Sequence, residues 1–362
     1  MAVIALFYNS LIRVPIFSVR ASYDDFFPGE NPNEEQMTSN VRFELAQDST
    51  YLIHDSFFFQ MSHNNSGGIM FCDNLTNVSV VVEDCVFCQC SISGGMGGAI
   101  FFDCPSGDFV LNRVCAGYCY TRRGGSFQFA YITCGDENIN YAAYLSIYKC
   151  SPEAQSRYHC IGFCNGNQTM KSLNVTSCIV HLFSATYHWN PSVLLFDYST
   201  IHNTFAEGFV CLYFAGGDDN NMSYSNIVNN SQNYIYEYGV IYNWGEATTN
   251  IYKCVFLENA LFGNQILFSN PSGELIVIDC DFDQEITTLT NVSFAETKTY
   301  SSTSSLTHYL NNSCLIHPST WFPTPAQTMP PSPTECMIPT CNISPRRIKV
   351  EYIALFTLLI NQ

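Results

Sequence analysis

The 362-residue chain is predicted to be an all-β protein, a solenoid of about nine parallel coils. Three observations support this prediction. A strand-and-turn unit of under thirty residues recurs along the chain, no helix-length amphipathic pattern separates the strands, and one small or thiol residue recurs at one bend of each unit. A unit of this size cannot bury a core alone, so the copies must stack. At roughly 4.8 Å per coil, nine coils would form a rod about 40 Å long.

The repeated unit is clearest in residues 78–102. In its first part, residues 78–83, Val78, Val80 and Val82 alternate with Ser79, Val81 and Glu83, which predicts a short strand with one face inward. Asp84 and Cys85 then mark a bend. The glycine-rich segment 93–98 permits the positive φ angles of a second turn, and further short strands lie on either side of it.

Copies of this bend recur along the chain. Alignment of the bends gives nine positions that lie 22 to 36 residues apart: Ser56, Cys85, Val114, Cys150, Cys178, Thr200, Asn226, Cys254 and Cys280. Glycine followed by apolar residues recurs between the bends, as in Gly67-Gly68-Ile69-Met70 and Gly239-Val240-Ile241. A repeat of this length indicates a solenoid, and the unit is too short for a four-stranded propeller blade.

Two short motifs resemble a known family. Gly97-Gly98-Ala99-Ile100 matches the GGA(I/L/V) motif, and Phe256-Leu257-Glu258-Asn259 the FxxN motif, of the polymorphic outer-membrane-protein repeats, which also occur in protist surface proteins. The resemblance covers roughly residues 43–283. It implies a right-handed parallel β-helix of the pectate-lyase type.

The composition limits the class of partner. Hydrophobic residues make up 47% of the chain and charged residues only 12%, with a net charge of −17 and just 14 Lys and Arg. Nucleic acids and anionic membranes need a cationic face, so neither is an expected partner. Protein or glycan ligands remain the expectation.

The chain divides into four segments by composition. Residues 1–40 are either a weak signal-like sequence or a cap on the first coil, and residues 41–285 carry the repeats without a break. Residues 286–345 are rich in Ser, Thr and Pro, which is typical of a linker or stalk. In residues 346–362 a basic cluster precedes nine mostly apolar residues, too few to span a bilayer. This tail is read as a truncated membrane anchor, against the alternative of an ordinary chain end.

The chain contains 18 cysteines without the spacing of a zinc site. One interpretation is disulfides in an oxidising compartment, and the alternative is a ladder of buried thiols. Since residues one coil apart lie within disulfide range, the candidate pairs are Cys150 with Cys178, Cys254 with Cys280, and Cys90 with Cys119.

Glycosylation signals also favour an extracellular protein. Ten asparagines open an N-x-Ser/Thr sequon: Asn64, Asn74, Asn77, Asn167, Asn174, Asn221, Asn229, Asn291, Asn311 and Asn342. A chain rich in Asn, Ser and Thr also produces such triplets by chance, so they support the extracellular interpretation without deciding it.

No catalytic, cofactor-binding or metal-ligating constellation is predicted. The carboxylate groups Asp218-Asp219 and Asp279, Asp281 and Asp283 are read first as turn chemistry and a solvated face. Alternating aromatic residues from Tyr234 to Trp244 are read mainly as sheet packing, with an outward half that could bind sugar or protein. The expected function is a non-enzymatic structural or adhesive protein, secreted or at the cell surface. The alternative is a carbohydrate-active enzyme, a polysaccharide lyase or hydrolase, of the pectate-lyase-like fold.

Overall fold

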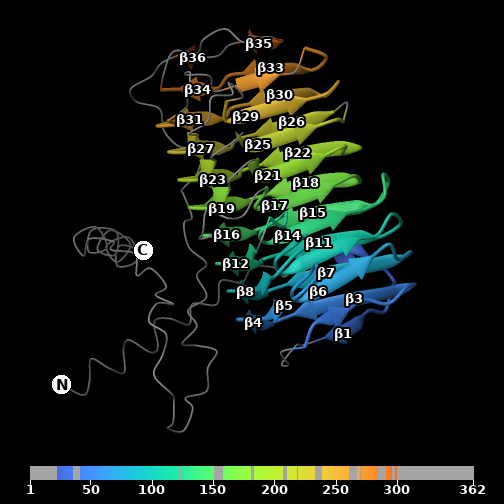
Figure 1. Ribbon diagram of the computed structural model, residues 1–362. Coiled ribbons are helices and arrows are strands. Elements are labelled where there is room, and N and C mark those ends of the chain that lie inside the picture. The colour runs from blue at the N-terminus through green and yellow to red at the C-terminus, as the bar shows by residue number, and fades with distance from the viewer. Residues whose placement is uncertain are drawn as a thin grey trace, which may run out of the picture. The chain divides into compact units, whose positions relative to one another are not determined.

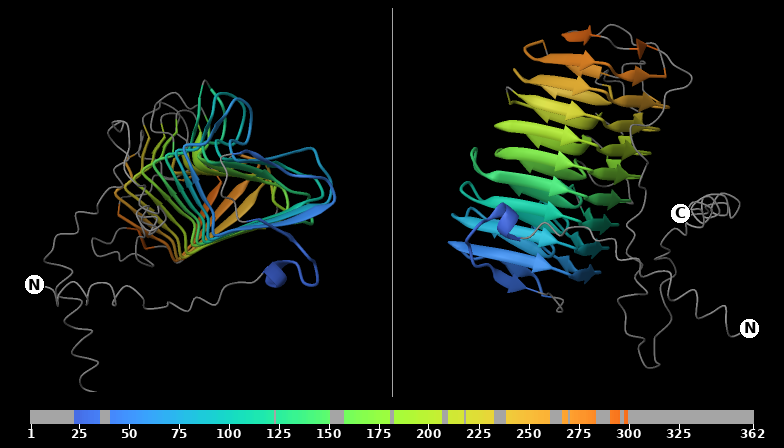
Figure 2. Two further views of the ribbon diagram at one scale, coloured as in Figure 1. Left: turned by 90° about the horizontal axis from the view of Figure 1, so that it is seen from below. Right: turned by 180° about the vertical axis from the view of Figure 1, so that it is seen from behind.

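A computed structural model describes residues 23–35, 41–122, 124–150, 158–180, 183–206, 210–217, 219–232, 239–260, 267–269, 271–283, 291–295 and 298–299. This part of the chain forms a parallel β-solenoid with three long sheets (Figure 1). It has about seven complete turns with shorter turns at the ends, slightly fewer than the nine predicted. Successive coils lie over one another when seen along the axis (Figure 2). The predicted all-β solenoid is confirmed.

Each turn contributes one strand to each long sheet. The first sheet contains β1 (Asn33–Glu35), β3 (Ser49–His54), β7 (Val78–Glu83), β11 (Asp108–Asn112), β15 (Ile139–Ala143), β18 (Asn167–Lys171), β22 (Val193–Asp197), β26 (Asn220–Ser223), β30 (Thr248–Tyr252), β33 (Glu274–Ile278) and β35 (Val292–Ala295). The second contains β2 (Phe43–Glu44), β6 (Met70–Asp73), β10 (Ile100–Asp103), β14 (Ala130–Thr133), β17 (Ile161–Cys164), β21 (Ser184–Trp189), β25 (Val210–Ala215), β29 (Ile241–Trp244) and β32 (Leu267–Ser269). The third contains β4 (Phe57–Phe59), β8 (Val86–Cys88), β12 (Cys115–Gly117), β16 (Ser146–Tyr148), β19 (Asn174–Thr176), β23 (Thr200–His202), β27 (Asn226–Val228), β31 (Val255–Leu257), β34 (Asp281–Phe282) and β36 (Lys298–Thr299).

Two short sheets complete the strands. They are formed by β5 (Ser62–His63), β9 (Ser91–Ile92) and β13 (Tyr120–Thr121), and by β20 (Ile179–Val180), β24 (Phe205–Ala206) and β28 (Ser231–Gln232). Each of their strands follows a strand of the third sheet in the chain. The pairing within both short sheets is parallel.

The core is a set of side-chain columns that run along the solenoid. The middle residue of each three-residue strand in the third sheet points inward, as Phe58 and Phe87 do, with ring centroids 4.7 Å apart. Near the other end Phe256 stacks on Phe282 at 4.6 Å. Every coil places a residue at the equivalent position of each column. Each of these side chains is therefore covered by those of the neighbouring coils, as expected of a repeat protein.

Each coil bends at two single residues with left-handed backbone conformation. In the unit of residues 78–102 these are Asp84 (φ 50°) and Gln89 (φ 56°), which flank β8. The first corner recurs at Asp55, Asp84, Arg113, Tyr144, Ser172, Tyr198, Tyr224, Lys253 and Asp279, and the second at Gln60, Gln89, Tyr118, Lys149, Ser177, Asn203, Asn229 and Glu258. Positive φ is uncommon outside glycine, so its recurrence at equivalent positions shows that stacking imposes the bend.

The residue after each of these two corners points into the core, and where it is Ser, Thr or Cys its side chain can cap the backbone carbonyl two residues earlier. Ser56 Oγ donates to the carbonyl of His54 at 2.8 Å, and Cys85 Sγ donates to that of Glu83 at 3.1 Å. At the second corner Cys90 Sγ reaches the carbonyl of Cys88 at 3.6 Å. A small side chain with one donor fits this position, which explains why Ser, Thr and Cys recur there.

The structure corrects the alignment of the bends. The first-corner column is Ser56, Cys85, Val114, Leu145, Leu173, Ser199, Ser225, Cys254 and Cys280. Cys150 and Cys178 belong to the second-corner column with Cys90 and Cys119, and Thr200 and Asn226 lie one residue past the corner. Leu145 and Leu173 carry no polar signal, so the sequence alignment moved to the nearest thiol.

The described solenoid extends beyond residues 41–285 at both ends. β1 adds a strand of the first sheet before residue 41, and β35 and β36 continue the first and third sheets past residue 285 to Thr299. At the other end α2 (Tyr23–Phe26) lies beside the first sheet (Figure 2), and Tyr23 and Phe27 pack on the outer side of Val81 and Val110. Residues 1–22 and 300–362, which include most of the predicted stalk and the tail, lie outside the described residues.

Candidate functional site

The outer face of the second sheet carries a continuous row of aromatic rings. Parallel register aligns Phe71, Phe101, Tyr131, Gly162, Tyr187, Tyr213 and Tyr242. We call the six aromatic residues of this row the aromatic stripe. Ring centroids are 5.5 Å apart for Phe71 and Phe101 and 5.2 Å apart for Tyr187 and Tyr213. These distances are in the range of favourable ring contacts.

Phe127 closes the gap that Gly162 leaves in the stripe. Its ring centroid lies 4.7 Å from that of Tyr131 and 5.8 Å from that of Tyr187. A Cβ atom on Gly162 would come within 2.1 Å of the Phe127 ring, and Phe127 itself has a φ of 62°, which is rare for a bulky residue. The strained backbone and the glycine together place this ring on the sheet.

His159 lies in the same cluster. Its imidazole ring is 4.2 Å from that of Tyr187 and stacks on Phe127 at 5.0 Å, and Ser184 Oγ lies 2.8 Å from Nδ1. Burial lowers the pKa of His159 to about 3. A histidine with such a low pKa is a poor general base for Ser184, so this Ser-His pair is better explained as packing.

Two exposed indoles lie beside the stripe. Trp189 and Trp244 are each 42% exposed, and both align with Ala215 of the strand between them. Trp189 stacks on Tyr187 at 6.0 Å with an angle of 15° between the rings, and Trp244 contacts Tyr242 at 5.7 Å. Two strand spacings separate the indoles by roughly 10 Å. They therefore form two platforms with a small alanine between them.

The other predicted aromatic residues fall elsewhere. Tyr234, Tyr236 and Tyr238 lie outside the described residues, whereas Tyr242 and Trp244 both face outward. The sequence did not single out the rest of the stripe, although a signal was present. Phe71, Phe101 and Tyr242 each stand three residues after a glycine of the repeat.

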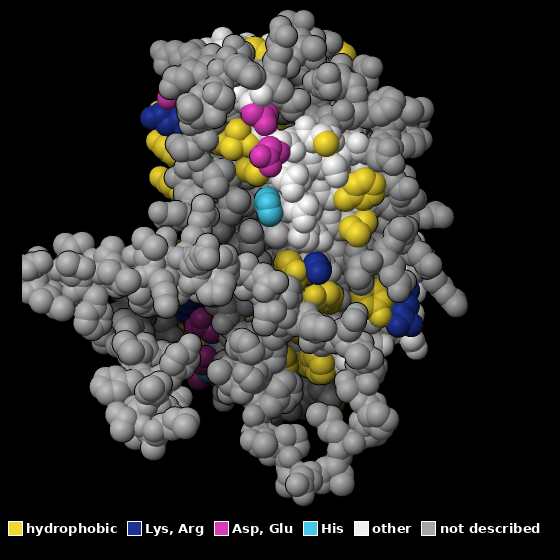
Figure 3. All heavy atoms as spheres, turned by 90° about the vertical axis from the view of Figure 1, so that its left-hand side faces the viewer, with side chains coloured by type: hydrophobic (Ala, Val, Ile, Leu, Met, Phe, Trp, Pro, Cys, Tyr) yellow, Lys and Arg dark blue, Asp and Glu magenta, His cyan; other side chains and the backbone are white. Residues whose placement is uncertain are grey.

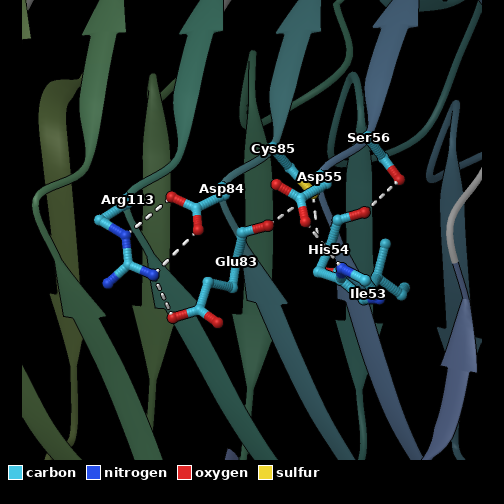
Figure 4. Close-up of polar contacts among 8 residues, drawn as sticks. All are labelled: Ile53, His54, Asp55, Ser56, Glu83, Asp84, Cys85 and Arg113. Atoms are coloured by element: carbon cyan, nitrogen blue, oxygen red, sulfur yellow. Dashed lines mark hydrogen bonds and ion pairs between the residues drawn. The ribbon is translucent and has the colours of Figure 1, made fainter. Parts of the chain in front are cut away.

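Glu83, Asp84 and Arg113 form a compact charged cluster at the first corner (Figure 4). Arg113 Nε donates to Asp84 Oδ1 at 2.7 Å, and Arg113 Nη2 donates to Glu83 Oε1 at 2.6 Å. Asn112 Nδ2 also donates to Glu83 Oε1, at 2.8 Å. Both carboxylates are bound by the same cation, so this cluster has the character of a structural ion pair.

A second carboxylate pair lies on the second sheet. Asp73 and Asp103 are aligned on neighbouring strands, in the same row that holds Trp189 and Trp244 further along. Burial, with a smaller contribution from Asp73, raises the pKa of Asp103. This is the described pair whose environments differ in the way that acid and base catalysis requires.

The predicted acidic set does not converge. Asp279 occupies a left-handed corner position, which interrupts the strand alternation, and Asp281 begins β34 beyond the bend. Asp218 is outside the described residues, and Asp219 lies in the turn before β26. In the described part of the chain, no group of three or more His, Cys, Asp or Glu residues is arranged to hold a metal ion.

The six candidate disulfide cysteines are adjacent as predicted but are free thiols. Cys90, Cys119, Cys150 and Cys178 follow one another in the second-corner column, and the Cys280 thiol accepts a hydrogen bond from the Cys254 amide at 3.3 Å. The predicted disulfides are therefore corrected to a buried thiol ladder. Cys90 and Cys254 donate to carbonyls, at 3.6 and 3.4 Å, which explains their place without a covalent bond.

The sequons separate by burial. Asn64, Asn74, Asn77, Asn167, Asn229 and Asn291 are exposed, and Asn221 is half-buried. Asn174 is buried in β19, where the next coil covers it, so it is corrected from an acceptor candidate to a structural residue. Asn311 and Asn342 lie outside the described residues.

The third sheet offers no comparable stripe among the residues that are described there. Figure 3 shows this side, where hydrophobic side chains form separate small groups among polar, basic and acidic ones. Lys149 lies 5.3 Å above the Tyr148 ring, and Phe57 stacks on Phe59 at 5.9 Å. Phe101, Tyr213 and Tyr242 of the stripe are themselves buried, so it is the exposed indoles beside them that make the second sheet the stronger candidate for a binding face.

Comparison of the chain with protein-family models, with curated proteins and with solved structures finds no match in any of the three. The solenoid is therefore established by this chain's own strand pairing. Within the described residues, no helix is long and apolar enough to cross a membrane.

Proposed function

We propose that this chain is a non-enzymatic structural or adhesive protein of the cell surface or extracellular space, and that its second sheet binds extended neutral glycans. The observation that carries the proposal is the pair of exposed indoles, Trp189 and Trp244. Large aromatic side chains that are exposed together on the surface of a protein usually mark a binding site. Sugar rings present apolar C–H faces that stack on such indoles.

The geometry favours a chain ligand over a single sugar. The two indoles lie on one sheet face, roughly 10 Å apart, with Ala215 between them. This separation is close to that of every second ring along an extended β-linked polysaccharide. The rigid strands hold both platforms before the ligand arrives, which reduces the entropy lost on binding.

The charge favours a neutral ligand. The chain carries a net charge of −17, and acidic polysaccharides would be repelled from it. The surface location is supported by the six exposed sequons. Attachment to a membrane through residues 346–362 stays part of the proposal, as does the extracellular compartment.

Two features support the finer resemblance to the polymorphic outer-membrane-protein repeats. Gly97 has a φ of 69°, and a Cβ there would lie 1.9 Å from the Ile100 carbonyl oxygen, so the GGA(I/L/V) motif has a backbone reason. In the FxxN motif, Phe256 fills the core and Asn259 Nδ2 donates to the Ile227 carbonyl at 2.7 Å. A right-handed pectate-lyase-like helix is consistent with both.

Binding to a polysaccharide panel tests the proposal. Wild type, Trp189→Ala, Trp244→Ala and the double variant are titrated with neutral β-glucan and xylan and with polygalacturonate. Each single change is expected to weaken neutral-glycan binding about 10-fold, since an interface aromatic contributes over 1 kcal/mol. Tyr144→Ala is the control, because Tyr144 is 65% exposed but lies at the first corner. Equal binding by the double variant and wild type would refute the indole platforms.

A polysaccharide lyase or hydrolase is the second candidate, and Asp73 with Asp103 is the observation that favours it. Two carboxylates with different environments could act as acid and base on a bound glycan. The same panel is therefore assayed for new reducing ends. Activity that Asp103→Asn abolishes would replace the non-enzymatic proposal, whereas binding without cleavage supports it. Surface labelling of intact cells tests the location separately.

A further inference from the structure

One thiol outside the two corner columns contacts a thiol within them. Cys160 precedes β17 in the second sheet, at the position that holds Ile69, Ala99 and Phe129 in earlier coils. Its Sγ donates to the Sγ of Cys178 at 3.4 Å rather than to a backbone carbonyl. Both side chains are completely buried.

Cys178 is a normal member of the second-corner column. Its thiol donates to the Thr176 carbonyl at 3.6 Å and accepts the hydrogen bond from Cys160. The two cysteines belong to the same coil, 18 residues apart in sequence. The contact therefore joins the second sheet to the opposite corner of a single turn, instead of joining one coil to the next.

We propose that Cys160 and Cys178 form an intramolecular disulfide when the chain folds in the presence of a low-molecular-weight disulfide such as oxidised glutathione. In the first exchange one of the two thiolates attacks the glutathione disulfide, forms a mixed disulfide and releases one glutathione thiolate. The second protein thiolate then attacks the mixed disulfide and releases the second glutathione. The protein loses two electrons and two protons, and the donor gains them as two thiols.

The geometry favours this pair over Cys90 with Cys119. A disulfide has an S–S length of about 2.05 Å, so the two sulfurs must approach by roughly 1.4 Å, within the reach of side-chain rotation. The Cys90 and Cys119 thiols instead each lie within hydrogen-bonding distance of two carbonyls, at 3.6 to 3.7 Å, and can donate their single proton to either. Those thiols would have to give up a bond to a carbonyl before pairing.

Burial sets the order of events. It raises the pKa of the Cys160 thiol well above its ordinary value, so Cys160 is not a nucleophile in the folded chain. Both side chains are also fully buried, so glutathione cannot reach either sulfur in the folded chain and exchange must occur while the coil is still open to solvent. Once formed, the bond is shielded from reductants by the same burial.

Peptide mapping after oxidative refolding tests this inference. The full chain is unfolded with reductant, refolded in reduced and oxidised glutathione, denatured with a maleimide and digested with trypsin and chymotrypsin. Cleavage after Phe163 and Lys171 separates Cys160, Cys164 and Cys178 onto different peptides. The expected product is a linked peptide pair that contains Cys160 and Cys178 and that disappears on reduction.

Two variants sharpen the result. Cys160→Ala should increase the number of free thiols by one, that of Cys178, and should abolish a rise in melting temperature of roughly 5 °C that refolding with oxidised glutathione gives to wild type. Cys211→Ala is the matched control, since Cys211 is an equally buried second-sheet cysteine whose loss should leave the linked pair intact.

The map of the wild-type protein decides the outcome even if a variant fails to fold. Complete alkylation of Cys160 and Cys178 would overturn the proposal. A linked pair that joins Cys178 to Cys150 would also overturn it and would favour the vertical pairing expected from the sequence. Neither result bears on glycan binding, which involves a different face.

Discussion

Acid should destabilise this solenoid through two buried histidines. His188 points into the core between Phe163 and Phe214, with its Nδ1 atom 2.9 Å from Gln168 Oε1. Burial lowers the pKa of His188, as of His159, to about 3. In the unfolded chain a histidine has a pKa of about 6.5. Between these two values the unfolded state binds protons that the folded state does not.

The sign and size follow from this difference. Stability is fully present above pH 6.5 and is lost as the pH falls from 6.5 towards 3, by about 1.4 kcal/mol per pH unit for each histidine. At pH 5 each histidine should cost about 2 kcal/mol of unfolding free energy and the two together about 4 kcal/mol. A typical domain has only about 5 to 15 kcal/mol in total, so the effect is measurable.

The assay is urea unfolding at pH 7, 6 and 5, with His188→Asn as the test variant. Asparagine already occupies this core column at Asn243, and it does not titrate. The variant should start less stable at pH 7, but its disadvantage should shrink by about 2 kcal/mol at pH 5. Phe214→Leu, which shortens a side chain of the same column without removing a proton site, should keep the wild-type slope. If His188→Asn also keeps that slope, the imidazole is not held neutral by burial and the reasoning fails.

Two further predictions concern the backbone and the charged corner. Gly97→Ala should cost at least about 2 kcal/mol of unfolding free energy, because its φ is positive and a Cβ has no room, whereas Gly94→Ala, whose Cβ would meet no atom closer than 4.0 Å, should stay within about 1 kcal/mol of wild type. A similar loss in both, measured by urea unfolding, would contradict the steric argument. Arg113→Met should cost about 3 kcal/mol because it leaves the buried Glu83 carboxylate without its cation, while Lys171→Met on the exposed surface should change little. Thermal unfolding of both variants distinguishes a structural ion pair from a dispensable surface contact.

The stacking of repeated coils could be predicted from the sequence, but the exact position of the bend in each coil could not. Alternation in residues 78–83 and the recurrence of small residues at bends predicted the stacked coils. The bend itself depends on one left-handed residue, and its identity varies from Asp84 to Arg113 to Tyr144. Since stacking imposes this conformation on unrelated side chains, no local propensity reveals it. The two coils with a leucine at the first corner, Leu145 and Leu173, were therefore aligned at the thiol of the second corner.

The candidate binding face shows the same division. Tyr242 and Trp244 stood out because they lie in a dense aromatic segment, but the six residues of the aromatic stripe come from six different coils. Its gap at Gly162 is filled by Phe127 from the preceding coil. A side chain that reaches from one coil onto the next does not alter the sequence periodicity of either coil. The contact between Phe127 and Gly162 could therefore not be predicted from the sequence.

The thiol ladder changes what the cysteine count can indicate. A hydroxyl or thiol residue after a left-handed corner is small, tolerates complete burial and can donate to the carbonyl two residues earlier. Serine does so at Ser56, as cysteine does at Cys85, and the thiol is the more apolar of the two. Seven of the eighteen cysteines, Cys85, Cys90, Cys119, Cys150, Cys178, Cys254 and Cys280, lie in the two corner columns, so the geometry of the solenoid explains these seven without disulfide bonds. Evidence for an oxidising compartment has to come from a cysteine that caps no carbonyl, and Cys160 is the one whose contact with Cys178 makes that test possible.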